Sequence, residues 1–246
     1  MKRNARFLSL LMSLLMALSL AGCGDGNKTT DNVKTQDAPT SAPQDSNADS
    51  SQTLAAKDSD ETEETEMESA ENNILVVYFS RTGEQYGVGV IDKGNTEIVA
   101  EIIAEETGAD LFEVTPAEDY YPMTYSELTD VAKKELSDNA RPEYAGEAPD
   151  FSKYSTIFIG APVWWGDWPM IMYTFFEKNA EGLSDKALVP FSTHEGSGLS
   201  GFDKKLASAC PNSTVLEGLA IRGGDCQNDK DGVKDKVDKW IEELGY

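Results

Sequence analysis

The chain has 246 residues, and its 44 acidic against 21 basic residues give a formal net charge of −23 at pH 7. Nucleic-acid binding through charge is excluded, because it requires a basic surface. The acidity favours partners with a basic docking face, although it can equally serve solubility alone.

The first 22 residues have the layout of a secretory signal peptide: three basic residues among the first six, then an apolar run over 7–20, then small residues. That run has about 14 residues, short of the ~20 of a spanning helix, and an uncleaved anchor is the alternative. The sequence Leu-Ala-Gly-Cys at 20–23 resembles the lipobox of bacterial lipoproteins. The resemblance implies that Cys23 is lipidated and becomes the first mature residue, which predicts an extracytoplasmic protein lipid-anchored to the cell membrane. An ordinary secreted protein is the other alternative.

Residues 23–72 therefore comprise the lipidated cysteine and a disordered acidic linker. The segment is poor in apolar residues and shows no helical or strand period, so it cannot bury enough surface to offset its ordering entropy. A flexible chain of this length spans on the order of 40 Å. Because residues 1–22 carry +3 and residues 24–72 carry −10, residues 73–246 carry −16 of the total −23. This last segment suits one domain with a full core.

Apolar runs alternate with helical patterns throughout residues 73–246. Alternation with short connections predicts an α/β fold with a doubly wound parallel sheet of five strands and helices on both faces. Ligands of such sheets bind at the carboxyl ends of the strands. The expected strands cover 74–79, 111–114, 156–160, 187–193 and 215–221, and the expected helices cover 95–107, 124–136, 169–178, 200–206 and 233–244.

Cys210 and Cys226 stand at opposite ends of the fifth expected strand. Seven residues of strand extend roughly 23 Å, whereas a disulfide needs Cα atoms within about 7 Å. We therefore expect two free thiols.

The loop after the first strand contains the groups that an anion-binding site requires. Ser80, Thr82 and Thr96 supply hydroxyl groups, Gly83 permits a tight turn, and Asn95 is placed to cap the following helix. Free amides and the positive end of the helix dipole would favour a phosphate monoester. The alternative is an ordinary capped turn.

The loops after the third and fourth strands offer groups suited to a flat ligand. Residues 162–168 contain three tryptophans, of which we expect one or two to enter the core and one to face a ligand. Glycines within 193–198 allow backbone amides to approach a planar ring. His194, the single histidine, either adjusts the protonation of such a ring or caps a helix.

Several other sites are excluded by their motifs. No glycine completes a dinucleotide fingerprint after Gly87 and Gly89, and no Gly-Lys-Ser/Thr forms a P-loop. His194-Glu195 lacks the second histidine of a zinc helix, so no metal site is predicted, and no Gly-x-Ser-x-Gly elbow occurs. The acids of a receiver domain are also missing after the first and third strands.

Four motifs, in order, resemble the flavodoxins, and among them the flavodoxin-like proteins found alone or in lipoproteins of anaerobic bacteria. They are Tyr-Phe-Ser-Arg-Thr-Gly at 78–83, Gly-Asn-Thr at 94–96, Pro-Val-Trp-Trp-Gly at 162–166, and Pro-Phe-Ser-Thr at 190–193 with Gly-Ser-Gly at 196–198. The resemblance spans 73–246 and implies strand order 2-1-3-4-5 and FMN as cofactor. It assigns the phosphate to the first loop and the isoalloxazine ring to the later two. The implied cofactor-binding residues are Ser80, Arg81, Thr82, Gly83, Asn95, Thr96, Pro162, Val163, Trp164, Trp165, Gly166, Thr193, His194, Gly196, Ser197 and Gly198.

Two departures from the flavodoxin pattern affect this interpretation. Residues 84–94 form an insert, which either folds over the phosphate, the outcome we expect, or displaces Asn95 and Thr96 from it. The fourth loop lacks an aromatic residue, which would leave one face of the flavin open.

Three functions follow from these patterns. The favoured one is an electron carrier that exchanges electrons with a redox partner protein and uses no catalytic side chain. An NAD(P)H-dependent FMN quinone reductase is the second, and a non-redox binding lipoprotein that has lost flavin is the third. An exported site meets little NAD(P)H, which favours the carrier, whereas an open flavin face favours the reductase.

Overall fold

A computed structural model describes residues 73–246 of the chain. The predicted signal peptide, the lipidation of Cys23 and the acidic linker lie outside the described residues. Within the described part, no helix combines the length and the apolar character needed to cross a bilayer.

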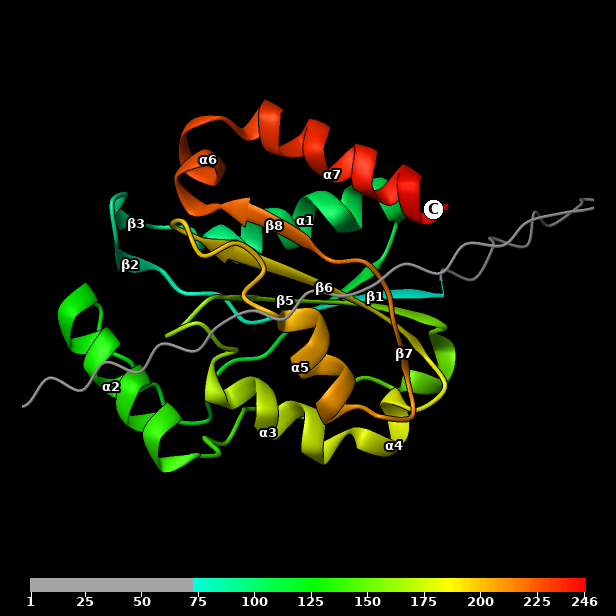
Figure 1. The fold of residues 1–246 in the computed structure, drawn as a ribbon, viewed down its shortest axis with the longest axis horizontal. Helices are drawn as coiled ribbons and strands as arrows, with labels where there is room; N and C mark the ends of the chain where they lie inside the picture. The colour runs from blue at the N-terminus through cyan, green and yellow to red at the C-terminus, as the bar shows by residue number, and fades with distance from the viewer. Residues whose placement is uncertain (1–72) are drawn as a thin grey trace, which may run out of the picture. The chain divides into compact units, whose positions relative to one another are not determined.

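The described chain is an α/β domain built on one parallel sheet and one small hairpin (Figure 1). The sheet has the order β4-β1-β5-β6-β7, with β8 also paired to β6, and all of these pairs are parallel. This confirms the predicted doubly wound sheet and the order 2-1-3-4-5. The strands are β1 (Ile74–Tyr78), β2 (Gly83–Gln85), β3 (Gly89–Ile91), β4 (Asp110–Glu113), β5 (Thr156–Pro162), β6 (Ala187–His194), β7 (Thr214–Val215) and β8 (Leu219–Arg222).

The helices cover both faces of the sheet. In Figure 1, α1, α6 and α7 lie above it, and α3, α4 and α5 lie below it with α2. Their bounds are α1 (Asn95–Thr107), α2 (Tyr125–Asp138), α3 (Met170–Lys178), α4 (Ala180–Leu183), α5 (Phe202–Ala209), α6 (Gly223–Asn228) and α7 (Lys230–Leu244), and a 3₁₀ turn covers Phe151–Lys153.

Two hydrophobic cores fill the space between the sheet and its helices. Residues of β1 alternate between them, because successive strand residues point to opposite faces. Val77 packs with Phe175 of α3 in one core, and Val76 packs with Val99 of α1 in the other. Central strands are thus covered on both sides, which explains why they are continuous apolar runs in the sequence.

The fifth predicted strand, 215–221, is wrong as one unbroken strand. Leu188 of β6 pairs with Val215, and Phe191 of β6 pairs with Leu219. Between these two pairs β6 advances by three residues and the edge strand by four, so the edge strand contains one extra residue. Pro190 lies in the intervening part of β6 and has no amide hydrogen to donate to a ladder. The strand therefore divides into β7 and β8 opposite this proline.

The insert forms an element that the sequence patterns did not predict. Its residues contribute most of the antiparallel hairpin β2–β3, in which Glu84 pairs with Val90. Helices α4 and α6 were also not predicted; both are short, at four and six residues, and offer little periodicity to detect.

The two cysteines of the described chain are free, as predicted, and both are buried. Burial raises the pKa of Cys210 to about 11. Burial, with a contribution from Asp225, raises that of Cys226 to about 12. Both thiols are therefore protonated at neutral pH, which makes them poor nucleophiles.

Candidate functional site

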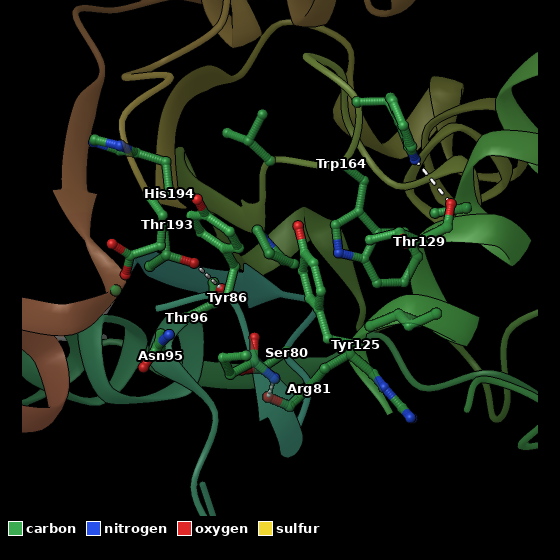
Figure 2. A pocket seen from close by; sticks show the side chains of 18 residues that line it. Ser80, Arg81, Tyr86, Asn95, Thr96, Tyr125, Thr129, Trp164, Thr193 and His194 are labelled. Carbon is green, nitrogen blue, oxygen red and sulfur yellow. Dashed lines mark hydrogen bonds between the residues drawn. The ribbon is translucent and has the colours of Figure 1, made fainter. Parts of the chain in front are cut away.

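A cavity of about 200 Å³ opens at the carboxyl ends of β1, β5 and β6 (Figure 2). A cavity of about 150 Å³ is known to hold a benzene ring, so this one has room for part of a planar ligand. Its wall combines polar groups with aromatic rings. The lining residues are Ser80, Arg81, Gln85, Tyr86, Asn95, Thr96, Tyr125, Leu128, Thr129, Ala132, Pro162, Val163, Trp164, Trp165, Thr193, His194, Glu195 and Gly223.

The polar end of the cavity is built around the first turn of α1. Ser80 Oγ accepts a hydrogen bond from the amide of Glu97 at 3.0 Å, so a residue from the preceding loop satisfies one of the free helix amides. Gly94 is the N-cap, and a Cβ there would meet Ser80 Oγ at 2.0 Å. The loop and the helix can approach this closely only because residue 94 is a glycine.

The predicted capping role of Asn95 is wrong, because Asn95 is the first helical residue and no side chain at the N-cap position bonds the helix amides. Its Oδ1 atom instead accepts a hydrogen bond from Gln227 Nε2 of α6 at 2.7 Å. Next to it, the hydroxyl groups of Thr96 and Thr193 are hydrogen-bonded to each other at 2.7 Å. These contacts hold the start of α1 against α6 and the end of β6.

Arg81 lies on the same wall, and its side chain is only 10% exposed. The guanidinium pairs with Asp119 at 3.1 Å and donates to the carbonyl oxygen of Tyr121 at 2.7 Å. Its Nε atom is buried and has no hydrogen-bond partner among the described residues. An unpaired buried donor costs free energy, which an acceptor that reached this nitrogen would lower.

The loop after β5 forms a tight hairpin turn that displays Trp165. Trp164 and Asp167 exchange two backbone hydrogen bonds, both 3.0 Å, around a two-residue turn. Trp165 and Gly166 have φ values of 53° and 76°, which defines a type I′ turn. Trp165 is 52% exposed at the tip of this turn and lines the cavity.

One of the three tryptophans enters the core, within the one or two that the sequence predicts, and the ligand-facing role of another stays a prediction. Trp168 is buried and stacks on Phe202, with ring centroids 3.7 Å apart. Trp164 is partly buried and meets Phe79 edge-on at 5.3 Å while also lining the cavity. One ring therefore belongs to the core and two remain on the cavity wall.

Helix α2 supplies a second wall that the sequence analysis did not identify. Tyr125, Leu128, Thr129 and Ala132 all line the cavity. Their spacing of three, four and seven residues places them on one face of a helix. The same spacing was visible in the sequence, but nothing there indicated that this face meets the loops at the ends of β1 and β5.

The hairpin of the insert contributes Gln85 and Tyr86 to the cavity, two further residues that the sequence analysis missed. The rings of Tyr86 and Tyr125 lie 5.6 Å apart. In Figure 2 this pair lies between Thr193 and Trp164.

His194 and Glu195, at and just after the end of β6, complete the polar part of the cavity wall. Burial lowers the pKa of His194, and its Nδ1 atom accepts a hydrogen bond from the amide of Gly196 at 2.9 Å. The imidazole is therefore neutral at pH 7 and carries its proton on Nε2. Glu195 pairs with Arg222 at 2.9 Å and accepts from the amide of Gly224 at 2.6 Å.

Some predicted cofactor-binding residues are not on this wall. Thr82 borders a neighbouring cavity with Glu97 and Glu113, and Gly83 is buried against Met123, where a Cβ would meet the carbonyl oxygen at 2.7 Å. The other four belong to the loops that carry the wall residues. The residues concerned are Thr82, Gly83, Gly166, Gly196, Ser197 and Gly198, and their part in cofactor binding stays a prediction.

The cavity thus has a polar end and an aromatic end. Hydroxyl groups, a guanidinium and the start of α1 form the first, and tryptophan, tyrosine and aliphatic side chains form the second. This division suits a ligand with an anionic group on one side and a planar ring on the other.

A sequence profile of the family described as flavodoxin matches residues 73–244. Among solved structures, a predicted flavoprotein from Bacteroides uniformis is 27% identical with a TM-score of 0.54, and the match covers 69% of this chain and 97% of that one. A predicted flavoprotein from Bacteroides eggerthii is 28% identical with a TM-score of 0.53, covering 68% and 96%. A flavoprotein from Lactobacillus acidophilus, solved in complex with FMN, is 23% identical with a TM-score of 0.51, covering 69% and 98%. A search of curated protein sequences found no significant match.

Proposed function

Because the chain belongs to the flavodoxin family, we propose that residues 73–246 bind FMN and carry electrons between proteins outside the cytoplasmic membrane. The observation that carries this proposal is the cavity at the carboxyl ends of β1, β5 and β6. It joins a polar end at the start of α1 to an aromatic end at Trp164 and Trp165. FMN has the matching division into a phosphate and a tricyclic ring.

The residues at the polar end fit a phosphate. Ser80 and Thr96 would donate from their hydroxyl groups, and the first turn of α1 would add amides and the favourable end of its dipole. Arg81 carries a positive charge that Asp119 partly neutralises, and its Nε is a donor that no described residue uses. The single carboxylate on the wall, Glu195, is engaged by Arg222 and the amide of Gly224 and therefore offers less repulsion to an anion.

The aromatic end fits an isoalloxazine ring. The half-exposed indole of Trp165 is a costly surface unless something covers it. A flat ring stacked on it would remove apolar area from water and gain the additional attraction between aromatic systems. Pro162 and Val163 border the same region.

The chemistry of the wall favours electron transfer over proton-transfer catalysis. When bound, FMN would supply the redox chemistry. The ionisable groups on the wall are Arg81, Tyr86, Tyr125, His194 and Glu195. Arg81 and Glu195 are ion-paired, and His194 is hydrogen-bonded through Nδ1. None is arranged as an acid–base pair, so the residues would bind and orient the cofactor.

The surroundings of the site agree with this role. The charge of −16 on residues 73–246 would attract a redox partner with a basic docking face and would disfavour adding negative charge to the flavin. Lipidated Cys23 and the linker would tether the domain to the outer side of the membrane while leaving it a reach on the order of 40 Å. Within that distance of the membrane, the tethered domain would be free to meet a redox partner.

A reductase that takes electrons from NAD(P)H and passes them to quinones is the second candidate. The rim is open on one side, where Trp165 and Tyr86 are 52% and 62% exposed, so a second planar molecule has access to the ring region. Mixing the flavin-loaded protein with NADH or NADPH and a quinone separates the two functions. Turnover with a small donor identifies a reductase, whereas a flavin reduced only by protein donors identifies a carrier.

The visible spectrum of purified protein, recorded before and after adding FMN and desalting, tests the cofactor directly. We expect flavin absorption bands at about one FMN per chain. A colourless protein that retains no FMN would contradict the proposal and favour a binding lipoprotein without redox function.

A further inference from the structure

The hairpin β2–β3 presents the most exposed aromatic residue of the cavity. Tyr86 follows β2 at the hairpin turn and is 62% exposed, and its neighbour Tyr125 at the start of α2 is 37% exposed. Their ring centroids are 5.6 Å apart at an interplanar angle of 39°. Two adjacent, solvent-facing rings on a cavity wall are an apolar surface that a planar ligand could cover.

The hairpin is fastened to the parts of the protein that form the site. The amide of Glu84 donates to the carbonyl oxygen of Met123 at 2.8 Å, and a carboxylate oxygen of Glu84 accepts from the amide of Tyr125 at 2.9 Å. Glu84 therefore satisfies a free amide at the start of α2, much as a capping side chain would. The position of Tyr86 is thereby tied to that of Tyr125.

A second set of hydrogen bonds connects the hairpin to the loop after β1. Gln85 Nε2 donates to the carbonyl oxygens of Arg81 and Thr82, at 3.4 and 3.3 Å. The hairpin thus spans from the loop that begins the polar end to the helix that forms the aromatic end. Since these contacts use Glu84 and Gln85 and none involves the side chain of Tyr86, substitution of that side chain leaves them in place.

The tyrosine pair belongs to the aromatic end of the cavity. Tyr125 shares its helix face with Leu128, Thr129 and Ala132, and the carbonyl oxygen of Thr129 accepts from Trp165 Nε1 at 2.9 Å. The first turn of α1, with Ser80 and Thr96, makes the polar end. A ring lying against Trp165 would therefore meet the α2 side of the cavity rather than the start of α1.

We propose that Tyr86 and Tyr125 form an aromatic wall that contacts the ring of the bound flavin, so that the insert recognises the ring and not the phosphate. This assignment rests on the proposed function. It replaces the expectation that the insert folds over the phosphate, and it gives an aromatic contact from the first loop to a site whose fourth loop has none. Tyr86 thereby becomes a cofactor-contacting residue that no motif of the sequence marks.

Binding titrations of FMN and riboflavin, which share the ring but differ in the phosphate, test the proposal. The variants are Tyr86→Ala and Tyr125→Ala, with Tyr86→Phe as the conservative variant and Val90→Ala as the matched control. Val90 is on the same hairpin, is 79% exposed and does not line the cavity. All are made in the full chain, and their thermal unfolding is compared with the wild type.

We expect Tyr86→Ala to raise the Kd for FMN and for riboflavin by the same factor, about three- to tenfold. Tyr125→Ala should behave alike, whereas Tyr86→Phe and Val90→Ala should bind like the wild type. Tyr125 begins α2, so its substitution can also destabilise the helix. If Tyr125→Ala unfolds at a lower temperature than the wild type, the proposal is judged on Tyr86→Ala alone. A loss confined to FMN would show contact with the phosphate and overturn the assignment, as would unchanged binding of both ligands.

The experiment also separates this assignment from the proposed function. A wild-type protein that binds neither flavin would overturn both. If the wild type binds FMN tightly and Tyr86→Ala binds it with the same Kd, only the aromatic wall is overturned.

Discussion

The indole nitrogen of Trp165 donates a hydrogen bond to the carbonyl oxygen of Thr129, with 2.9 Å between the two atoms. The bond joins the turn after β5 to the middle of α2, and Lys133 of the same helix places its ammonium 4.9 Å from the centre of the Trp165 ring. These contacts hold a non-glycine residue at a φ of 53°, which costs about 1–3 kcal/mol. A strained residue that keeps an exposed ring at a cavity is a candidate for ligand binding.

Trp165→Ala is expected to weaken FMN binding by about 1–3 kcal/mol, the range found for stacking of bases on aromatic side chains. Trp165→Phe should recover part of this loss, because a ring remains at the turn. Fluorescence titration with FMN measures both values. An unchanged Kd for Trp165→Ala would remove this residue from the ring site.

Ser80→Ala is expected to weaken FMN more than riboflavin, because Ser80 lies at the polar end where the phosphate would bind. The variant also loses the bond to the amide of Glu97, which should lower the free energy of unfolding by about 1 kcal/mol. Ser208→Ala serves as the control, since Ser208 is exposed on α5 and lines neither this cavity nor the neighbouring one. Parallel titrations with both flavins decide the point, and an equal loss for both would argue against a phosphate at Ser80.

Gly94→Ala is expected to disturb the polar end and to lower the free energy of unfolding by about 1–3 kcal/mol, because the new Cβ would meet Ser80 Oγ at 2.0 Å. Gly224→Ala is the matched control, since a Cβ there would meet Glu195 no closer than 3.6 Å. Urea unfolding of the two variants gives the comparison. Equal stability of both would contradict the close approach of loop and helix.

Acidification should destabilise the protein through His194. Its pKa in the folded protein is lowered by burial and by Arg222, against opposing effects of Glu195 and Asp225. Below the ordinary value of about 6.5 the unfolded chain binds this proton more readily than the folded one, so the free energy of unfolding falls as the pH falls from 6.5 through the folded pKa. Protonation of Nδ1 would also displace the amide of Gly196.

The variant His194→Gln isolates this contribution from that of the carboxylates. Urea unfolding of both proteins between pH 5 and 7.5 should show a smaller loss on acidification for His194→Gln. Parallel profiles would mean that His194 titrates alike in the folded and unfolded chains.

Cys23→Ala is expected to release the protein from membranes, because the proposed lipid attaches at this cysteine and each buried CH₂ group contributes about 0.8 kcal/mol to anchoring. Fractionation of cells that express the wild type, Cys23→Ala and the control Ser41→Ala measures the effect. Ser41 lies in the linker, so its variant should remain with the membranes. Continued membrane association of Cys23→Ala would favour an uncleaved anchor helix.

Much of the fold could be predicted because central strands of a doubly wound sheet are covered on both faces. This requirement makes β1, β5 and β6 continuous apolar runs, and the alternation with helices then leaves a parallel sheet as the consistent arrangement. The divided edge strand could not be predicted from periodicity. It depends on Pro190 of the neighbouring strand, a contact between segments that are far apart in sequence.

The site was predictable in part for a related reason. Loops at the carboxyl ends of parallel strands meet at one edge of the sheet, so Ser80, Trp165 and His194 could be assigned to one site from their places after strands. Tyr86 and Tyr125 could not, because one lies in an insert and the other on a helix whose contacts depend on packing. Asn95 was misassigned as a cap, since the neighbouring Ser80 satisfies the helix amide instead.

By itself, the sequence determined the order of strands and helices, the separate acidic segment before residue 73 and the loops that carry polar and aromatic side chains, because composition and periodicity are local properties. Only the tertiary structure decided which of these side chains share a wall. Trp165 meets Thr129, and Tyr86 meets Tyr125, through crossovers and a hairpin that bring together segments 36 and 39 residues apart. Such contacts follow from the packing of whole elements, which no local pattern contains.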